Sequence, residues 1–313
     1  MARVLTTLLG TVCVAGVAIA LHETSRDARG PLRPSATALG LAALLVGLGH
    51  LCGAIAWERC LGRGTSRLRR AYYASQLGKY LPGGIWQPVG QVGIALGAGL
   101  DSRRVLAGYV ASQACFVAAG ASIVGVGLVV ARPALPGWAL ALTSAGVLVC
   151  TSAAHRPTLA RVLDRLPSAL QRRPIADSLP SQQQMVRCTG WSVAKVLLQA
   201  ASFAIVLGSI DPSVSHASAS TAYVAAWLVG IVFVPIPSGI GIREAALVML
   251  LASSAPATAA VLAASVGHRA PVILAELCLA AATWRRRPTD ARGPLVAAMR
   301  AVDAGAPGPV DGA

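Results

Sequence analysis

Long runs of apolar residues without charge recur along this chain of 313 residues. A run of ~20 apolar residues crosses the hydrocarbon core of a bilayer as a helix, because every backbone polar group must be bonded within the segment. Only 12% of the residues are charged, whereas soluble chains carry roughly 25%. The sequence therefore predicts an all-α polytopic integral membrane protein, with six transmembrane helices over 4–21, 35–57, 105–131, 135–154, 191–210 and 256–284. A cleaved signal peptide is an alternative for 4–21, but the many later runs favour a retained helix.

The net charge of +15 is concentrated between the apolar runs. Such a charge also occurs in nucleic-acid-binding proteins, but aromatic residues make up only 4% of this chain, so we expect anionic lipid and no nucleic acid. Lys and Arg near span ends stay cytoplasmic. This rule predicts a bacterial-type cytoplasmic membrane protein with both termini cytoplasmic. The loops 132–134 and 211–220 are then outside. The cytoplasmic segments are 58–70, 101–104, 155–190 and 285–313. The arginines of 22–34 disagree, and 285–313 reads as a disordered tail.

Seven cysteines, an odd number without a C-x-x-C pair, predict neither a disulfide framework nor a zinc site. His50 and His268 are isolated, so we expect no metal ligation there. We expect no cofactor, and the chain has no G-x-x-x-x-G-K-[ST] loop for direct use of ATP.

Two further apolar stretches, 71–100 and 221–254, contain a proline- and glycine-rich break, so neither forms one straight helix. For the predicted sides of the other spans to be consistent, both ends of each stretch must lie on the same side of the membrane. This requirement predicts two re-entrant helical hairpins. The breaks share an apolar-Pro-small-Gly-Ile core at 81–85 and 236–240. This similarity predicts an inverted repeat, 35–131 and 191–284, within one transmembrane domain over 1–284. Two ordinary kinked helix pairs are the alternative.

At these breaks the sequence, from Gln76 to Trp86 and from Pro237 to Ala246, resembles the lysylphosphatidylglycerol synthase transmembrane family. In that family the membrane module is associated with moving aminoacylated phosphatidylglycerol between leaflets. The resemblance implies a substrate-binding set of Lys79, Pro82, Gly83, Gly84, Trp86, Pro237, Gly239, Gly241, Arg243, Glu244 and Arg269. The chain ends shortly after Arg287, so we expect no aminoacyl-transferase domain. Without that domain, we expect no enzymatic transfer of an amino acid from aminoacyl-tRNA to a lipid. The lipid that the protein moves is left open.

Ionisable side chains at membrane depth cost about 3 kcal/mol or more each, and they persist only with partners or in a hydrated cavity. We expect Arg243 and Lys79 to bind phosphate, with Glu244 orienting Arg243 or accepting a cationic head group. A purely structural Arg243–Glu244 ion pair is the alternative.

Arg269 and Glu276 are seven residues apart, so they share a helix face about 10 Å apart along the axis. At that distance they do not pair directly. Glu276 is expected to meet Lys195, either as a structural pair or in gating or proton relay. Trp86 and Trp284 are expected to be interfacial anchors, which is the alternative to substrate binding by Trp86.

A lipid flippase or translocase is the leading functional hypothesis, acting on an anionic or zwitterionic phospholipid or a lipid-linked head group. One alternative is a membrane-embedded glycosyl or acyl transferase, although the external cluster His22, Glu23 and Asp27 has no partner group. Another is an accessory subunit of a separate synthase or glycosyltransferase. The expected partners are membrane lipids and, in the last case, such an enzyme, while the oligomeric state, energy source and direction of transport stay open.

Overall fold

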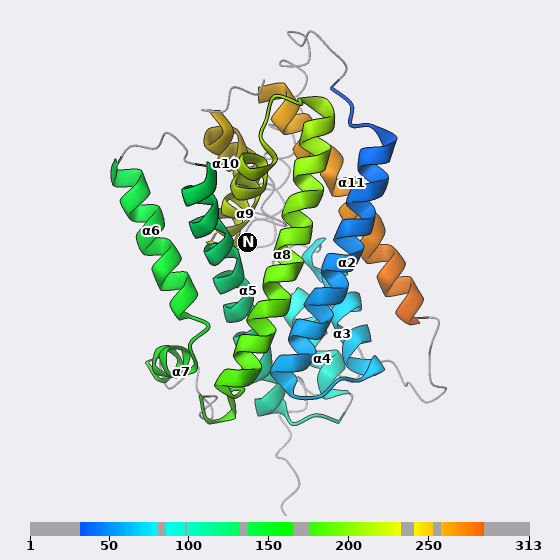
Figure 1. The fold of residues 1–313 in the computed structure, drawn as a ribbon. Helices are drawn as coiled ribbons and strands as arrows, with labels where there is room; N and C mark the ends of the chain where they lie inside the picture. Colours follow the sequence, from blue (N-terminus) through cyan, green and yellow to red (C-terminus); the bar gives the residue numbers. More distant parts are fainter. Residues whose placement is uncertain are drawn as a thin grey trace, which may run out of the picture.

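The computed structural model describes residues 32–80, 86–97, 99–131, 137–165, 176–232, 241–252 and 258–284. These residues are mostly helical and contain no strand (Figure 1). Four helices are long and apolar enough to cross a membrane: α2 (Ala36–Leu61), α5 (Ser102–Ala131), α8 (Gln182–Ile210) and α11 (Thr258–Trp284). The prediction of a polytopic all-α membrane protein is thus confirmed. The predicted span 4–21 and tail 285–313 lie outside the described residues.

The shorter helices lie between the long ones in the chain. The first predicted hairpin contains α3 (Ser66–Gln76), the 3-10 turn η1 (Leu77–Tyr80) and α4 (Trp86–Leu96). The second contains α9 (His216–Val232) and α10 (Ile242–Leu251). The central part of the chain adds α6 (Gly137–Ser152), α7 (Arg156–Asp164) and η2 (Ala176–Ser178).

Two predicted boundaries differ from the structure because polar residues take part in the helices. Helix α8 begins nine residues before 191, where Ser181 and Gln184 form a capping box that satisfies free backbone amides. With α7, it converts much of the predicted loop 155–190 into helix. Helix α6 lies within the predicted span 135–154, whose first two residues are outside the described part of the chain. Helix α3 starts at Ser66, inside the predicted basic segment 58–70, and packs against α2, α4 and α11.

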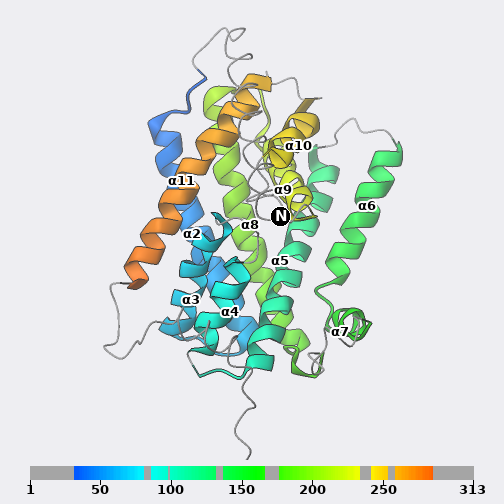
Figure 2. The ribbon, with the colours of Figure 1, turned by 180° about the vertical axis from the view of Figure 1, so that it is seen from behind.

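The helix contacts keep the same pattern when α2, α3, α4 and α5 are exchanged with α8, α9, α10 and α11. The pair α3–α4 corresponds to α9–α10, α2–α5 to α8–α11, and α5–α8 to α11–α2. Likewise α4–α5 corresponds to α10–α11, and α3–α11 to α9–α5. In both views α3 and α4 lie in the lower half of the bundle and α9 and α10 in the upper half (Figures 1 and 2). An inverted repeat would produce this contact pattern, and the repeat stays a prediction.

The outer surface of the bundle is apolar, as expected where lipid replaces water. On α2, four leucines spaced three or four residues apart form a stripe, and each is between 40% and 58% exposed: Leu41, Leu44, Leu48 and Leu51. The buried interior, by contrast, includes ionisable groups on four helices: His50, Lys195, Glu244, His268 and Glu276. A soluble protein has the opposite distribution.

Helices α2 and α8 pack closely along the centre of the bundle, and glycines on α2 permit this approach (Figure 1). A Cβ atom at Gly49 would lie 3.3 Å from the carbonyl oxygen of Lys195. A Cβ atom at Gly53 would overlap the Tyr72 hydroxyl and lie 2.9 Å from Cδ of Lys195. The absence of a side chain at Gly53 therefore makes room for a polar contact between α3 and α8.

Candidate functional site

Two groups of charged residues, each around a buried carboxylate, lie inside the bundle, and the first surrounds Glu276 on α11. We call this group the Glu276 cluster: His50, Tyr72, Lys79, Tyr80, Lys195 and Glu276. Lys79 of η1 forms an ion pair with Glu276, and the Tyr80 hydroxyl donates a hydrogen bond to the same carboxylate at 2.9 Å. His50 Nε2 lies 3.0 Å from Glu276 Oε1. One carboxylate thus connects α11 with η1 and α2.

Lys195 of α8 completes the Glu276 cluster. Its Nζ donates a hydrogen bond of 3.0 Å to the Tyr72 hydroxyl and lies 3.8 Å from the ring centroid of Phe116. The side chain is buried, so its ammonium group depends on this hydroxyl and on the ring face for stabilisation.

The second group lies at the start of α10, and we call it the Glu244 cluster: Tyr223, Gly241, Arg243, Glu244, Ser265, His268 and Arg269. The Glu244 carboxylate accepts hydrogen bonds from Arg269 at 2.6 Å and from the Ser265 hydroxyl at 3.1 Å. It also accepts the backbone N–H of Gly241 at 2.6 Å, which caps its own helix. Gly241 has a φ of 90°, a conformation that glycine adopts without the strain other residues incur.

Arg243 belongs to the same helix turn but has a different environment. Its guanidinium carbon lies 4.3 Å from the ring centroid of Tyr223 on α9. Its Nε is buried and has no hydrogen-bond partner among the described residues. Tyr223 also makes an edge contact with His268, whose Nε2 lies 2.7 Å from the Ser202 hydroxyl. Arg243 therefore has a donor still available at a position fixed by packing.

Helix α11 carries a partner for each hairpin. Arg269 pairs with Glu244 of the second hairpin, and Glu276 pairs with Lys79 of the first. The two residues are seven positions apart, about 10 Å along a helix axis, as the sequence indicates.

Among the residues that the structure describes, each cluster contains one more positive than negative charge. The Glu276 cluster holds Lys79 and Lys195 against a single carboxylate. The Glu244 cluster holds Arg243 and Arg269 against a single carboxylate. An uncompensated cation in an apolar surrounding is costly, so each cluster is suited to an anionic ligand.

One predicted pairing, Glu276 with Lys195, and one alternative, an Arg243–Glu244 ion pair, differ from the contacts in the structure. Glu276 pairs with Lys79 of η1 and not with Lys195, because Lys195 points to Tyr72 and Phe116. Glu244 pairs with Arg269 and not with the adjacent Arg243, because neighbouring residues on a helix point in different directions.

The structure describes only some of the remaining predicted residues. Trp86 begins α4 and is 37% exposed, and the side chain of Trp284 is not described. Five predicted residues lie outside the described residues: Pro82, Gly83, Gly84, Pro237 and Gly239.

Sequence reasoning missed the aromatic and hydroxyl residues of both clusters. Tyr72, Tyr80, Tyr223 and Ser265 supply hydrogen bonds or ring faces to the buried charges. Tyr80 stands next to Lys79 in the sequence, which is a usable signal. The others come from distant segments, and only the packing of the helices brings them to the charges.

Outside the long spans, Arg69 of α3 forms an ion pair with Glu58 near the end of α2. Arg69 Nε lies 2.9 Å from Glu58 Oε1, and this hydrogen bond raises the pKa of the Arg69 guanidinium above its usual range. The Arg69 side chain is 54% exposed, so this pair fixes the α2–α3 connection rather than forming part of a buried site.

The helical bundle with an apolar exterior and internal charges is that of a polytopic membrane protein. The model of the lysylphosphatidylglycerol synthase transmembrane region matches residues 35–275, so the chain belongs to this family. The match runs from the cap of α2 to the residue before Glu276, and it includes both hairpins. A search among curated proteins returns no match.

Proposed function

We propose that this protein translocates a lipid with a phosphate-bearing head group between the leaflets of a cytoplasmic membrane. The carrying observation is that, among the described residues, each of the two clusters holds one more cation than carboxylate. A phosphodiester supplies the missing negative charge, and its acyl chains can stay in the surrounding lipid. Family membership supports a role in membrane lipid chemistry.

Arg243 is the proposed phosphate ligand of the Glu244 cluster. Its planar guanidinium offers several donors that match phosphate oxygens, and its Nε has no partner among the described residues. Arg269 is held by Glu244 and contributes charge at short range. In the Glu276 cluster, Lys79 is held by the Glu276 carboxylate and Lys195 by the Tyr72 hydroxyl. We assign Arg243 the direct contact.

A flipping assay in proteoliposomes tests this proposal. The purified protein is reconstituted with trace amounts of fluorescent phosphatidylglycerol, phosphatidylethanolamine or phosphatidylcholine, and dithionite quenches the label in the outer leaflet. We expect the wild type to expose inner-leaflet label of at least one of these lipids to the reagent. Comparing the three labelled lipids identifies the preferred head group.

Arg243→Ala is expected to abolish most of this movement, because it removes the proposed phosphate ligand. Arg187→Ala is the matched control, since Arg187 is an exposed arginine on the outside of α8. Lipid movement by Arg243→Ala at the wild-type rate, in a protein that elutes normally from a size-exclusion column, would contradict the proposal.

A further inference from the structure

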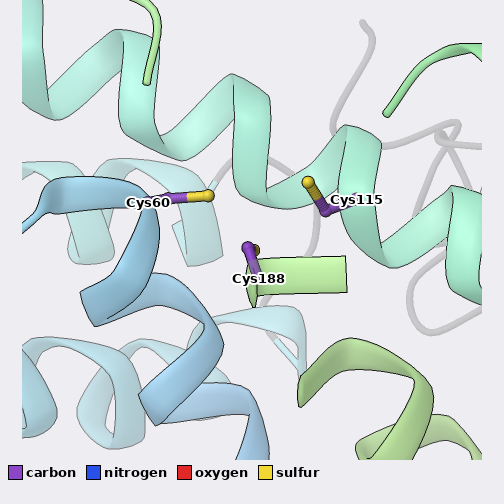
Figure 3. Close-up of side chains that lie close together, drawn as sticks. All are labelled: Cys60, Cys115 and Cys188. Carbon is purple, nitrogen blue, oxygen red and sulfur yellow. The ribbon is translucent and has the colours of Figure 1, made fainter. Parts of the chain in front are cut away.

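Three cysteines from different helices meet inside the bundle, although their sequence spacing shows no motif. Cys60 lies near the end of α2, Cys115 in α5 and Cys188 in the second turn of α8 (Figure 3). All three are buried, and their sulfur atoms lie within 4.8 Å of one another. The sequence-based expectation of no metal ligation by cysteine overlooked this convergence, because each residue comes from a separate helix.

The spacing of the sulfur atoms is close to that of a three-sulfur metal site. Metal–thiolate bonds are about 2.3 Å long. At the 4.8 Å limit, the centre of an equilateral triangle lies about 2.8 Å from each sulfur. An inward movement of about half an ångström per side chain, which a small χ1 rotation provides, reaches bonding distance.

The surroundings of the cluster are suited to a bound ion that is shielded from water. Buried apolar residues pack around the sulfurs, among them Ala56, Ala107, Ala111 and Leu159. The Cys115 thiol donates a hydrogen bond of 3.5 Å to the carbonyl oxygen of Met185, which fixes the direction of this side chain.

We propose that Cys60, Cys115 and Cys188 bind one soft monovalent metal ion, Cu(I). Thiolate ligands select Cu(I), zinc or iron–sulfur clusters. Structural zinc sites are almost always four-coordinate, whereas the described residues bring three His, Cys, Asp or Glu ligands together here. Cu(I) accepts three sulfur ligands. The ion binds without a change of oxidation state, and each thiol that becomes a thiolate releases its proton to solvent.

The site joins helices from both halves of the predicted repeat. Cys60 and Cys115 belong to α2 and α5, and Cys188 belongs to α8. A bound ion therefore connects the two helices of the central α2–α8 contact with a third helix. We expect Cu(I) to raise the unfolding temperature of the protein.

A Cu(I) titration tests the proposal. The full-length protein is purified in detergent, reduced, treated with chelator, and kept without oxygen. Cu(I) is added as its acetonitrile complex in competition with bathocuproine disulfonate. We expect one tightly bound Cu(I) per chain, thiolate-to-copper charge-transfer absorption in the ultraviolet, and a copper–sulfur shell of three atoms in X-ray absorption.

Matched variants locate the ion. Cys60→Ser is expected to weaken Cu(I) binding by about 100-fold or more, since it removes a direct ligand. Cys52→Ser, two turns earlier on α2 and outside the cluster, is expected to bind as the wild type does. Equal binding by Cys60→Ser and the wild type would overturn the proposal, as would a wild type that binds no Cu(I).

A second variant keeps the test decisive if Cys60→Ser does not fold. Replacing the other four cysteines, at positions 13, 52, 150 and 278, by serine retains the cluster alone. This variant must still bind one Cu(I), and failure to do so overturns the proposal. A separate titration with Zn(II) tests the identity of the ion. Tighter binding of Zn(II) than of Cu(I) would overturn the Cu(I) assignment.

Discussion

Glu276 has more partners than any other single side chain in the Glu276 cluster, and none of them is close in sequence. Its carboxylate is fully buried and meets Lys79, Tyr80 and His50. Removing one member of a buried ion pair leaves the other charge uncompensated, which costs more than the pair itself contributes.

Glu276→Gln is therefore expected to destabilise the protein by about 3 to 5 kcal/mol, seen as a lower unfolding temperature in detergent. Adding Lys79→Met should restore part of the loss, because the second change removes the unpaired ammonium. Glu58→Gln provides the comparison, since its partner Arg69 is half exposed and we expect a smaller loss. An unfolding temperature for Glu276→Gln equal to that of the wild type would disprove this account of the cluster.

Gly53 makes a second residue-level prediction. Gly53→Ala places a methyl group against the Tyr72 hydroxyl, which must then move away from Lys195. We expect a loss of about 1 to 3 kcal/mol from overpacking. Gly47→Ala on the same helix meets no atom within 4 Å and should be neutral or slightly stabilising. Thermal unfolding of the two variants side by side measures the difference, and equal midpoints would be inconsistent with the close contact.

At the scale of elements, α11 connects the two hairpins through Arg269 and Glu276, and Pro271 lies between these two residues. Proline lacks the N–H that would bond the carbonyl of Gly267, so the helix is weakened between its two charged contacts. Proline inside a helix commonly bends it, so we expect the relative direction of the Arg269 and Glu276 contacts to depend on Pro271.

Pro271→Ala is expected to stabilise α11 by up to about 3 kcal/mol, because it restores a backbone hydrogen bond. The same change should slow lipid movement in the flipping assay, because a straighter helix shifts Arg269 relative to Glu276. A raised unfolding temperature together with slower flipping is the expected pair of results. Stabilisation with unchanged flipping would show that the bend has no part in transport.

At the scale of the whole molecule, the exchange pattern of helix contacts predicts opposite insertion of the two hairpins. The α2–α3 loop then faces the cytoplasm, and the α8–α9 loop faces outside, in line with the arginine distribution. Single cysteines at Arg63 and Ser213, both exposed loop positions, report this orientation in a variant whose other cysteines are replaced. We expect an impermeant maleimide to label Ser213→Cys in intact cells and Arg63→Cys only after permeabilisation. Labelling of both from one side would refute the inverted arrangement.

The sequence was sufficient to predict the membrane class and the positions of the four long apolar helices, because hydropathy acts locally. It was also sufficient to single out the ionisable residues as a set. It was insufficient to pair them. Lys79 meets Glu276 from almost 200 residues away, and Cys60, Cys115 and Cys188 converge only through the crossing of three helices. Helix crossing angles and rotations depend on the packing of all neighbours, which no local pattern contains.

The apolar stripe on α2 has a consequence for how this chain changes during evolution. Leu41, Leu44, Leu48 and Leu51 face outward, where one apolar side chain serves nearly as well as another. In related sequences, the residue at each of these positions should therefore vary among leucine, isoleucine, valine and phenylalanine. The inward positions of the same helix, such as His50 and Gly53, have defined neighbours and should change slowly. The outward leucines make α2 recognisable as a membrane span, but they should be the least conserved residues of the helix. The few residues that depart from its apolar composition should be the most conserved.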